Sequence, residues 1–389
     1  MQQIIKGIDK LPQILKDVNC QKLFLVVDSS FPFLNIKDAI EALDVEKVSF
    51  SGFTPNPLYE QVCKGIDLLK TEKCDTILAV GGGSAIDVAK CIKLAVLAKE
   101  GNDAILPPLV STCVECDGSK LSFIAIPTTA GTGSESTHNA VMYYENTKQT
   151  VTNDGVLPDY ALLEPSVLKT LPLYQKKCTM MDALCQGIES WWSVNSTEES
   201  YEYSRKTIEL IMANWEKYIF ENDDQASANI MLAANYGGRA INITATTAAH
   251  AMSYKITSLY KFPHGHAVSV CLPEIWEYMI DNMDKCIDKR GSVYLFDIFD
   301  LIAKTMSVEE PKDAIAIFRD MMKRMELGNP SFEKKNEDLE VLSTSVNPVR
   351  LKNNPVFLEN AVIRKLYKQI VELSLIHISE PTRPEPISY

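Results

Sequence analysis

The stretch CDTILAVGGGSAIDVAKCIKLAVLA (residues 74–98) decides the fold that we expect of this chain. Its first half is an apolar run typical of a buried strand, its glycines form a turn, and its second half has the apolar spacing of a helix. Backbone without a Cβ can approach a phosphate closely, and a helix N-terminus offers free N–H groups to an anion. The stretch therefore predicts a strand, a turn and a helix that bind a phosphate. Because it lacks the GxGxxG spacing, a purely structural turn is the alternative.

Runs of the same two kinds alternate on either side of this stretch. Strand-like apolar runs occupy residues 22–30 and 45–50, a helical pattern occupies 58–73, and a strand that leads into a loop occupies 121–136. Such alternation predicts an α/β fold with a doubly wound, mostly parallel sheet of the Rossmann-like type. The loop PTTAGTGSE (127–135) is a second turn rich in small and hydroxyl residues, and two such loops on one sheet favour a bound nucleotide.

The character of the sequence changes after residue 165. No comparable strand run follows, whereas apolar residues recur at helical spacing in residues 201–222, 226–241 and 293–306. We therefore expect an α/β domain over 1–165 and an all-helical domain over 166–372. The last stretch, 373–389, resembles a translated sequencing adapter, so we interpret it as a non-native tail; a natural disordered tail is the alternative.

Length, net charge and cysteine content indicate how many domains to expect and which kinds of partner to exclude. A length of 389 residues favours two domains. The net charge of -12 argues against nucleic acid, because a phosphate backbone requires a basic surface. No apolar run reaches the roughly 20 residues needed to span a bilayer, and the first residues lack the pattern of a signal peptide. The ten cysteines are therefore expected to be reduced thiols in a cytoplasmic protein.

Histidines cluster in the segment TTAAHAMSYKITSLYKFPHGHAVSV (246–270), which contains His250, His264 and His266 of the five in the chain. On the helix expected over 180–193, Asp182 and Gln186 are four residues apart and project from one face. Together these oxygen and nitrogen donors suit a divalent transition metal. Each part alone has a plainer explanation, a core histidine or an i,i+4 hydrogen bond. Only the combination predicts a metal site.

Several of these motifs together resemble the iron-containing (group III) alcohol dehydrogenases, over about residues 1–370. They are PNP at 55–57, GGGS with Asp87 and Lys90, PTTAGTGSE, a helix that opens with DAL, and a histidine followed fourteen residues later by the histidine of PHG. The resemblance implies that the first domain (1–165) binds a dinucleotide and that the helical domain (166–372) binds metal and substrate. It implies Fe²⁺, or Zn²⁺ in its place, held by Asp182, Gln186, His250 and His264.

The same resemblance implies NADH or NADPH as the cofactor. Its pyrophosphate is expected against the glycine turn and its nicotinamide half near the threonines of the second loop. The implied cofactor-binding residues are Asp28, Gly81, Gly82, Gly83, Ser84, Asp87, Thr128, Thr129, Thr132 and Lys148. Asp28 directly follows the strand run, where a carboxylate hydrogen-bonds a free ribose 2′-hydroxyl and repels a 2′-phosphate. This position favours NADH, although the branch named below is also expected to accept NADPH.

Two positions depart from the family pattern. The family has a histidine where this chain has Gln186, and the second histidine of an HxxxH motif where this chain has Tyr254. A neutral amide oxygen is a weaker ligand than imidazole, so metal binding is expected to be weaker or more selective. The catalytic proton is expected to come from His266 or Tyr254, through water or the cofactor ribose. Histidine has the better-matched ordinary pKa, about 6.5.

Within the family, segment 241–273 is most similar to the phosphonoacetaldehyde reductases (2-hydroxyethylphosphonate dehydrogenases). This similarity implies that a small anionic aldehyde is reduced to a primary alcohol, with Lys255 and Arg239 offsetting the phosphonate charge; the alternative is that both are solvated helix residues. Other readings are a general short-chain alcohol or polyol dehydrogenase, a dehydroquinate-synthase-like lyase and a catalytically silent binding protein. We expect no nucleic-acid or membrane partner, and a homodimer is one option for assembly.

Overall fold

The computed structural model describes residues 2–106, 120–145, 147–331, 335–346 and 348–378. The chain divides into two compact units. The first comprises Met1–Gly187 and Glu202–Ile243, and the second comprises Ile188–Tyr201 and Thr244–Tyr389. The first unit thus contains the α/β part and also some of the helices that follow residue 165. The boundary between the compact units therefore differs from the point where the strands end and the helical part begins.

A six-stranded parallel sheet forms the centre of the first unit, with the strand order β1-β8-β5-β4-β2-β3. In that order the strands are Gln3–Lys6, Tyr160–Leu163, Ser122–Pro127, Thr76–Gly81, Lys22–Val27 and Glu46–Phe50. The predicted α/β fold with a parallel sheet is therefore confirmed, and β2, β3, β4 and β5 lie within the runs that the sequence indicates. The two four-residue strands β1 and β8 were not predicted, because such short runs carry little periodicity.

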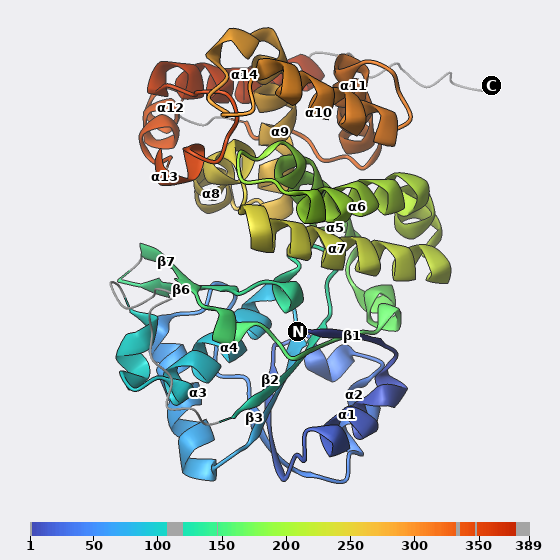
Figure 1. The fold of residues 1–389 in the computed structure, drawn as a ribbon, viewed down its shortest axis with the longest axis vertical. Coiled ribbons are helices and arrows are strands. Elements are labelled where there is room, and N and C mark those ends of the chain that lie inside the picture. The colour runs from blue at the N-terminus through green and yellow to red at the C-terminus, as the bar shows by residue number, and fades with distance from the viewer. Residues whose placement is uncertain (1, 107–119, 146, 332–334, 347, 379–389) are drawn as a thin grey trace, which may run out of the picture. The chain divides into compact units, whose positions relative to one another are not determined.

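Both faces of the central strands β2, β4 and β5 are buried, as their apolar sequences require. Alternate residues on one face pack with helices α3 (Tyr59–Glu72) and α4 (Gly83–Leu97), among them Phe24, Val26, Ile77, Ala79, Phe123 and Ala125. The intervening residues, such as Leu23, Leu78 and Ile124, are buried as well. Figure 1 shows α1 (Leu11–Asp17) and α2 (Lys37–Glu41) on the opposite side of the sheet from α3 and α4.

The strand register places three loops side by side. Val27 of β2 pairs with Val80 of β4, and Gly81 at the end of β4 pairs with Pro127 at the end of β5. Between the neighbouring strands β2 and β4 the direction of the connections reverses: β2 connects outward to β3, whereas β4 connects to β5 on the other side. Ligands of open α/β sheets bind at such a switch point, at the carboxyl ends of the strands. The glycine turn and the PTTAGTGSE loop both begin there.

An antiparallel hairpin and three helices complete the first unit. The hairpin pairs β6 (Asn139–Tyr144) with β7 (Thr147–Thr152). Helix α5 (Leu173–Trp192) is continuous across the boundary between the units, and it is followed by α6 (Glu198–Glu216), a π-helical turn at Lys217–Glu221 and α7 (Asp224–Thr244). Helices α6 and α7 confirm the two helical patterns predicted at 201–222 and 226–241.

The rest of the second unit is helical. Its elements are α8 (Ala248–Tyr260), α9 (His264–Asp281), α10 (Ser292–Thr305), α11 (Pro311–Arg324), α12 (Lys335–Thr344), α13 (Pro348–Leu351) and α14 (Asn360–Ile378). In the described part of this unit the only β-type pairing is one bridge between Cys286 and Val356. The expected helical second half is therefore confirmed. Helix α14 extends into the stretch interpreted as a tail, and residues 379–389 lie outside the described residues.

No helix among the described residues is long and apolar enough to cross a membrane. The described cysteines, eight in number, all carry free thiols.

Candidate active site

The glycine turn after β4 is held by Asp28, the first residue after β2. One carboxylate oxygen of Asp28 accepts a hydrogen bond from the backbone N–H of Gly82 at 2.9 Å, and the other accepts from the N–H and hydroxyl of Ser30 at 2.9 and 2.5 Å. A Cβ on Gly81 would lie 2.5 Å from the Asp28 carboxylate and 2.6 Å from the Cβ of Ala85. Only glycine fits at Gly81, and Asp28 fixes the turn that starts α4.

The turn also lies against the second predicted loop. The backbone N–H of Thr128 donates to the carbonyl of Gly81 at 3.0 Å. A Cβ on Gly82 would come within 3.6 Å of Thr129, and one on Gly83 within 3.0 Å of the Thr132 hydroxyl. Two loops that are about fifty residues apart in the sequence thus form one surface with little side-chain bulk. The Ser84 hydroxyl, at the start of α4, accepts from Asn56 N–H of the PNP turn at 3.4 Å.

Behind this surface, α4 carries a buried hydrogen-bond network around Lys90 and Asp87. Lys90 is fully buried and donates to the hydroxyls of Ser134 and Thr137, at 3.0 and 2.9 Å, and to the carbonyl of Asn139 at 2.6 Å. Asp87 accepts from the Ser134 hydroxyl at 2.6 Å and from the Val141 N–H at 3.0 Å. Burial lowers the pKa of Lys90 to about 8 and raises the pKa of Asp87, which Lys90 and, more weakly, Lys148 partly offset. The network locks the PTTAGTGSE loop and the hairpin onto α4.

Helix α7 closes on the same loop through glycines and a buried carboxylate. Gly133 has φ +60, and a Cβ there would lie 2.3 Å from the Cα of Gly238, so the backbones touch. Glu135 is buried, and its carboxylate accepts from the Asn235 amide at 3.1 Å. Burial is the main cause of its raised pKa. Sequence reasoning gave Glu135 and Gly238 no role; Gly237-Gly238 inside a helical pattern was the one available signal.

On α5, Asp182 and Gln186 project from one face as the spacing predicts, and both are buried. The Gln186 amide nitrogen donates to the Thr132 carbonyl at 3.3 Å and to the Asp182 carboxylate at 3.4 Å. Its amide oxygen is buried and has no hydrogen-bond partner among the described residues. In this orientation, the amide oxygen of Gln186 can accept from a donor or bind a cation.

In the second unit, Glu189 of α5 anchors His250. One oxygen of the fully buried Glu189 accepts from the Nδ1–H of His250. The other accepts from the Thr247 hydroxyl at 2.6 Å and from the N–H of Ala249 at 3.0 Å. Burial alone would raise the pKa of Glu189, but the neighbouring His250 and these hydrogen bonds hold it below its usual value. The sequence did not reveal Glu189, because its partners lie about sixty residues away.

The other two histidines differ in their surroundings. The His264 ring lies 5.4 Å from the His250 ring and is stacked on Tyr254 at 5.7 Å with an interplanar angle of 4°. His266 is buried, its ring is stacked on Phe262 at 4.2 Å, and its Nε2–H donates to the Gly328 carbonyl at 2.8 Å. Burial lowers the pKa of His266. Tyr254 thus shares the surroundings of His250 and His264, whereas His266 is held by a backbone carbonyl.

The two cations expected to bind the phosphonate are each partly buried on a helix. Lys255 lies on α8, one residue beyond Tyr254. Arg239 lies on α7, with its guanidinium 5.6 Å from the centre of the Tyr203 ring; burial raises the pKa of Glu135, and the charge of Arg239 offsets a small part of that rise.

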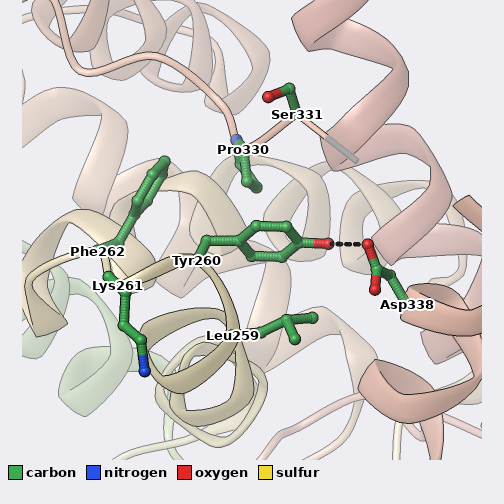
Figure 2. Close-up of a pocket in the computed structure, with 7 residues that line it drawn as sticks. All are labelled: Leu259, Tyr260, Lys261, Phe262, Pro330, Ser331 and Asp338. Atoms are coloured by element: carbon green, nitrogen blue, oxygen red, sulfur yellow. Dashed lines mark hydrogen bonds between the residues drawn. The ribbon is translucent and has the colours of Figure 1, made fainter. Parts of the chain in front are cut away.

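A cavity of about 350 Å³ adjoins the histidine segment in the second unit. Figure 2 shows its seven lining residues, with the Tyr260 hydroxyl directed at Asp338, to which it donates at 3.3 Å. Phe262, which stacks on His266, is also part of the wall. The lining holds one lysine and one aspartate, Lys261 and Asp338, and so no net charge that favours a dianion. Lys255 and Arg239 are not among the described residues that line it.

Two family models identify the family of this chain. The family model described as iron-containing alcohol dehydrogenase matches residues 4–165, and the model of the C-terminal domain of the Fe-containing alcohol dehydrogenase family matches residues 177–371. The chain is 29% identical to the phosphonoacetaldehyde reductase of Streptomyces viridochromogenes over 73% of each chain. It is 30% identical to long-chain-alcohol dehydrogenase 1 of Geobacillus thermodenitrificans, over 72% of this chain and 71% of that protein.

Solved structures share the fold. An iron-containing alcohol dehydrogenase from Thermococcus thioreducens matches with a TM-score of 0.83 and 23% identity, over 95% of this chain and 98% of that one. A sulfoacetaldehyde reductase from Bifidobacterium kashiwanohense, solved with NAD+, matches with a TM-score of 0.81 and 23% identity, over 96% and 97% of the two chains. With two family models that together span both halves of its sequence, this chain belongs to the iron-containing alcohol dehydrogenase family.

Proposed function

We propose that this protein is a metal-dependent NAD(P)H oxidoreductase that reduces phosphonoacetaldehyde to 2-hydroxyethylphosphonate. The observation that carries the proposal is the pair of imidazoles of His250 and His264, one of them fixed in orientation by the buried Glu189, next to the phenol of Tyr254. The similarity to a protein named phosphonoacetaldehyde reductase supports the substrate. Family membership makes this protein an oxidoreductase rather than a lyase or a silent binding protein.

The donor chemistry of this chain fits a divalent metal. We assign Fe²⁺, with Zn²⁺ as the alternative, to Asp182, Gln186, His250 and His264. Asp182 offers a carboxylate oxygen, and His250 and His264 each offer a ring nitrogen, as suits such an ion. Gln186 adds a buried amide oxygen that lacks another partner among the described residues. Hydrogen bonding of His250 through Nδ1 directs the remaining ring nitrogen to a ligand, as is usual for metal-binding histidines.

A bound divalent ion would supply Lewis acidity that polarises a carbonyl group. The chain itself must then provide a proton for the alcohol oxygen. We propose Tyr254 for this step ahead of His266, because Tyr254 stacks on His264 whereas the His266 Nε2–H is engaged by the Gly328 carbonyl. Substitution of Tyr254 by phenylalanine is expected to lower kcat about a hundredfold while metal content stays unchanged. Equal kcat in the two proteins would remove Tyr254 from this role.

The glycine turn and the second loop fit a nicotinamide dinucleotide, which would supply a hydride when bound. A Cβ at Gly82 or Gly83 would narrow the surface between the turn and Thr129 or Thr132 of the second loop, and the N-terminus of α4 offers N–H groups to a pyrophosphate. Asp28 places a carboxyl group directly after β2, a position that disfavours a 2′-phosphate, so we propose NADH as the better cofactor. Measurement of kcat/KM with NADH and NADPH tests this preference.

We propose that Lys255 and Arg239 bind the phosphonate, because a dianion in an acidic protein requires charge-assisted donors. Alanine at either position is expected to raise KM for phosphonoacetaldehyde and to leave KM for propanal unchanged. The variant Lys64→Ala, which removes an exposed lysine, is the control for general charge. Unchanged KM values in both variants would leave the substrate intact but remove this anion site.

A panel of aldehydes tests the substrate itself. Phosphonoacetaldehyde is expected to be reduced with a kcat/KM at least a hundredfold above that of propanal, since a paired phosphonate contributes about 3 kcal/mol or more. Similar values for the two aldehydes would instead favour a general short-chain alcohol dehydrogenase. The 30% identity to long-chain-alcohol dehydrogenase 1, against 29% to the phosphonoacetaldehyde reductase, supports an alcohol dehydrogenase without a phosphonate site, although that relative is named for long-chain alcohols.

A further inference from the structure

The carboxylate of Glu189 serves two groups at once. It is fully buried on α5, and its two oxygens have different partners. Oε2 accepts the Nδ1–H of His250, and Oε1 accepts from the hydroxyl of Thr247 and from three backbone N–H groups, those of Thr247, Ala249 and His250, at 3.2, 3.0 and 3.4 Å. Such a buried charge is tolerated only where it is this fully hydrogen-bonded.

The three N–H groups lie at the start of α8, where the helix itself offers no carbonyl to accept from them. The N-cap residue Thr247 makes no side-chain cap hydrogen bond of its own to this helix. Its hydroxyl instead donates to Glu189 and accepts from the indole N–H of Trp192 at 3.0 Å. A carboxylate from α5 therefore takes the position that a capping side chain normally fills. It thereby fixes the first turn of α8, from which His250 projects.

The hydrogen bond between Glu189 and the His250 ring also determines which ring nitrogen of His250 carries the proton. A neutral imidazole carries one proton, and an acceptor at Nδ1 keeps the proton there and leaves the lone pair at Nε2. We infer that Glu189 is a positioning residue that selects the Nε2-ligating form of His250 and aims it at the metal proposed above. This inference rests on the proposed metal site. It extends the site by a residue that touches neither metal nor substrate.

The substitution Glu189→Gln separates this role from simple capping. A glutamine retains one oxygen for the N–H groups of α8 and turns an NH₂ donor toward His250. The ring must then accept at Nδ1, which moves its proton to Nε2, the atom needed for the metal. We expect the affinity of the holoenzyme for Zn²⁺, measured by chelator competition, to fall roughly tenfold to a hundredfold. The visible spectrum of the Co²⁺-substituted protein should change with it.

Two variants serve as matched controls. Thr247→Val removes one donor to the capping oxygen but leaves the ring contact of His250. Glu274→Gln alters another buried glutamate of the same unit, which pairs with Arg319 at 2.7 Å. Both are expected to lower the melting temperature while the Zn²⁺ affinity stays within about twofold of wild type. A purely structural Glu189 would behave as they do: Glu189→Gln with wild-type affinity and an unchanged Co²⁺ spectrum overturns the inference.

The variant His264→Ala distinguishes this inference from the proposed function. Loss of metal affinity in His264→Ala together with wild-type affinity in Glu189→Gln overturns the role of Glu189 alone. Retained affinity in His264→Ala overturns the ligand set and the inference with it. Should Glu189→Gln fail to fold, Glu189→Asp keeps the charge but shortens its reach by one methylene. It is expected to show the same fall in affinity, and wild-type affinity in that variant would equally overturn the inference.

Discussion

At the scale of single residues, Gln186 shows how a substitution in a ligand set can be supported by its neighbours. Its amide nitrogen donates to the Thr132 carbonyl and to Asp182, which leaves the oxygen as the free end. From the sequence we expected a neutral, weaker ligand, and nothing there indicated that the amide would be held by a backbone carbonyl 54 residues away. The ligand assignment itself remains a prediction.

Replacing Gln186 by histidine is expected to tighten metal binding about tenfold, because imidazole is the stronger donor for Zn²⁺. The matched control is Gln186→Leu, which keeps the volume and removes the donor, and it should bind the metal more weakly than wild type. Chelator competition gives both affinities. If leucine and glutamine bind the metal equally well, Gln186 is not a ligand.

At the scale of secondary-structure elements, the turn between β4 and α4 is too tightly packed at Gly81 to accommodate a side chain. Gly81→Ala would put a methyl group 2.5 Å from the Asp28 carboxylate. We expect this overpacking to lower the free energy of unfolding by about 1–3 kcal/mol and to weaken NADH binding, read from nucleotide fluorescence. At Gly328 an added Cβ meets nothing within 4 Å. Gly328→Ala is therefore the control and should leave NADH binding intact.

The Lys90 network on α4 predicts a pH dependence of stability. Burial lowers the pKa of Lys90 to about 8, against 10.5 for an ordinary lysine. Between these values the unfolded chain binds one more proton than the folded one, so the free energy of unfolding should rise with pH, by at most about 1.4 kcal/mol per unit. Below pH 8 this contribution is flat.

Urea unfolding between pH 8 and 10.5 measures that slope. The variant Lys90→Met removes the titrating group and should lose the rise, whereas Lys64→Met, at an exposed lysine of α3, should keep it. Parallel slopes in wild type and Lys90→Met would mean that Lys90 stays charged in the folded protein throughout this range.

The elements also show what sequence patterns can and cannot reveal. The strands β2, β4 and β5 follow from their apolar runs, and the loops after β4 and β5 follow from their glycines, because both signals are local. β1 and β8 are too short for periodicity, and each gains its place from pairing along the edge of the sheet. Glu189 was missed for a related reason: on α5 it resembles any helical glutamate, and only the folded chain brings it to His250.

At the scale of the whole molecule, metal binding should contribute to stability by mass action. When the concentration of free metal is a hundred times the dissociation constant, binding adds about 2.7 kcal/mol to the free energy of unfolding. Removal of the metal with a chelator is therefore expected to lower the melting temperature by several degrees, and added Zn²⁺ should restore it. In His264→Ala the chelator should have no effect. A chelator shift of wild-type size in that variant would place the metal elsewhere.

The net charge of -12 is the whole-molecule property that the sequence states most directly. It predicts that any anionic substrate must be recognised by a few local cations, which is why Lys255 and Arg239 carry the substrate proposal. The homodimer remains a prediction, and sedimentation of the purified protein tests it.

The contact between Gly133 and Gly238 has a consequence for how this fold can diverge. A Cβ on Gly133 would lie 2.3 Å from the Cα of Gly238, and one on Gly238 would lie 2.5 Å from the carbonyl oxygen of Gly133. Because the obstacle is main chain in both directions, no side-chain change at one position makes room for a change at the other. The two sites should therefore stay fixed independently. A random library selected for folding should return glycine at both, with no correlated pairs to reveal that they touch.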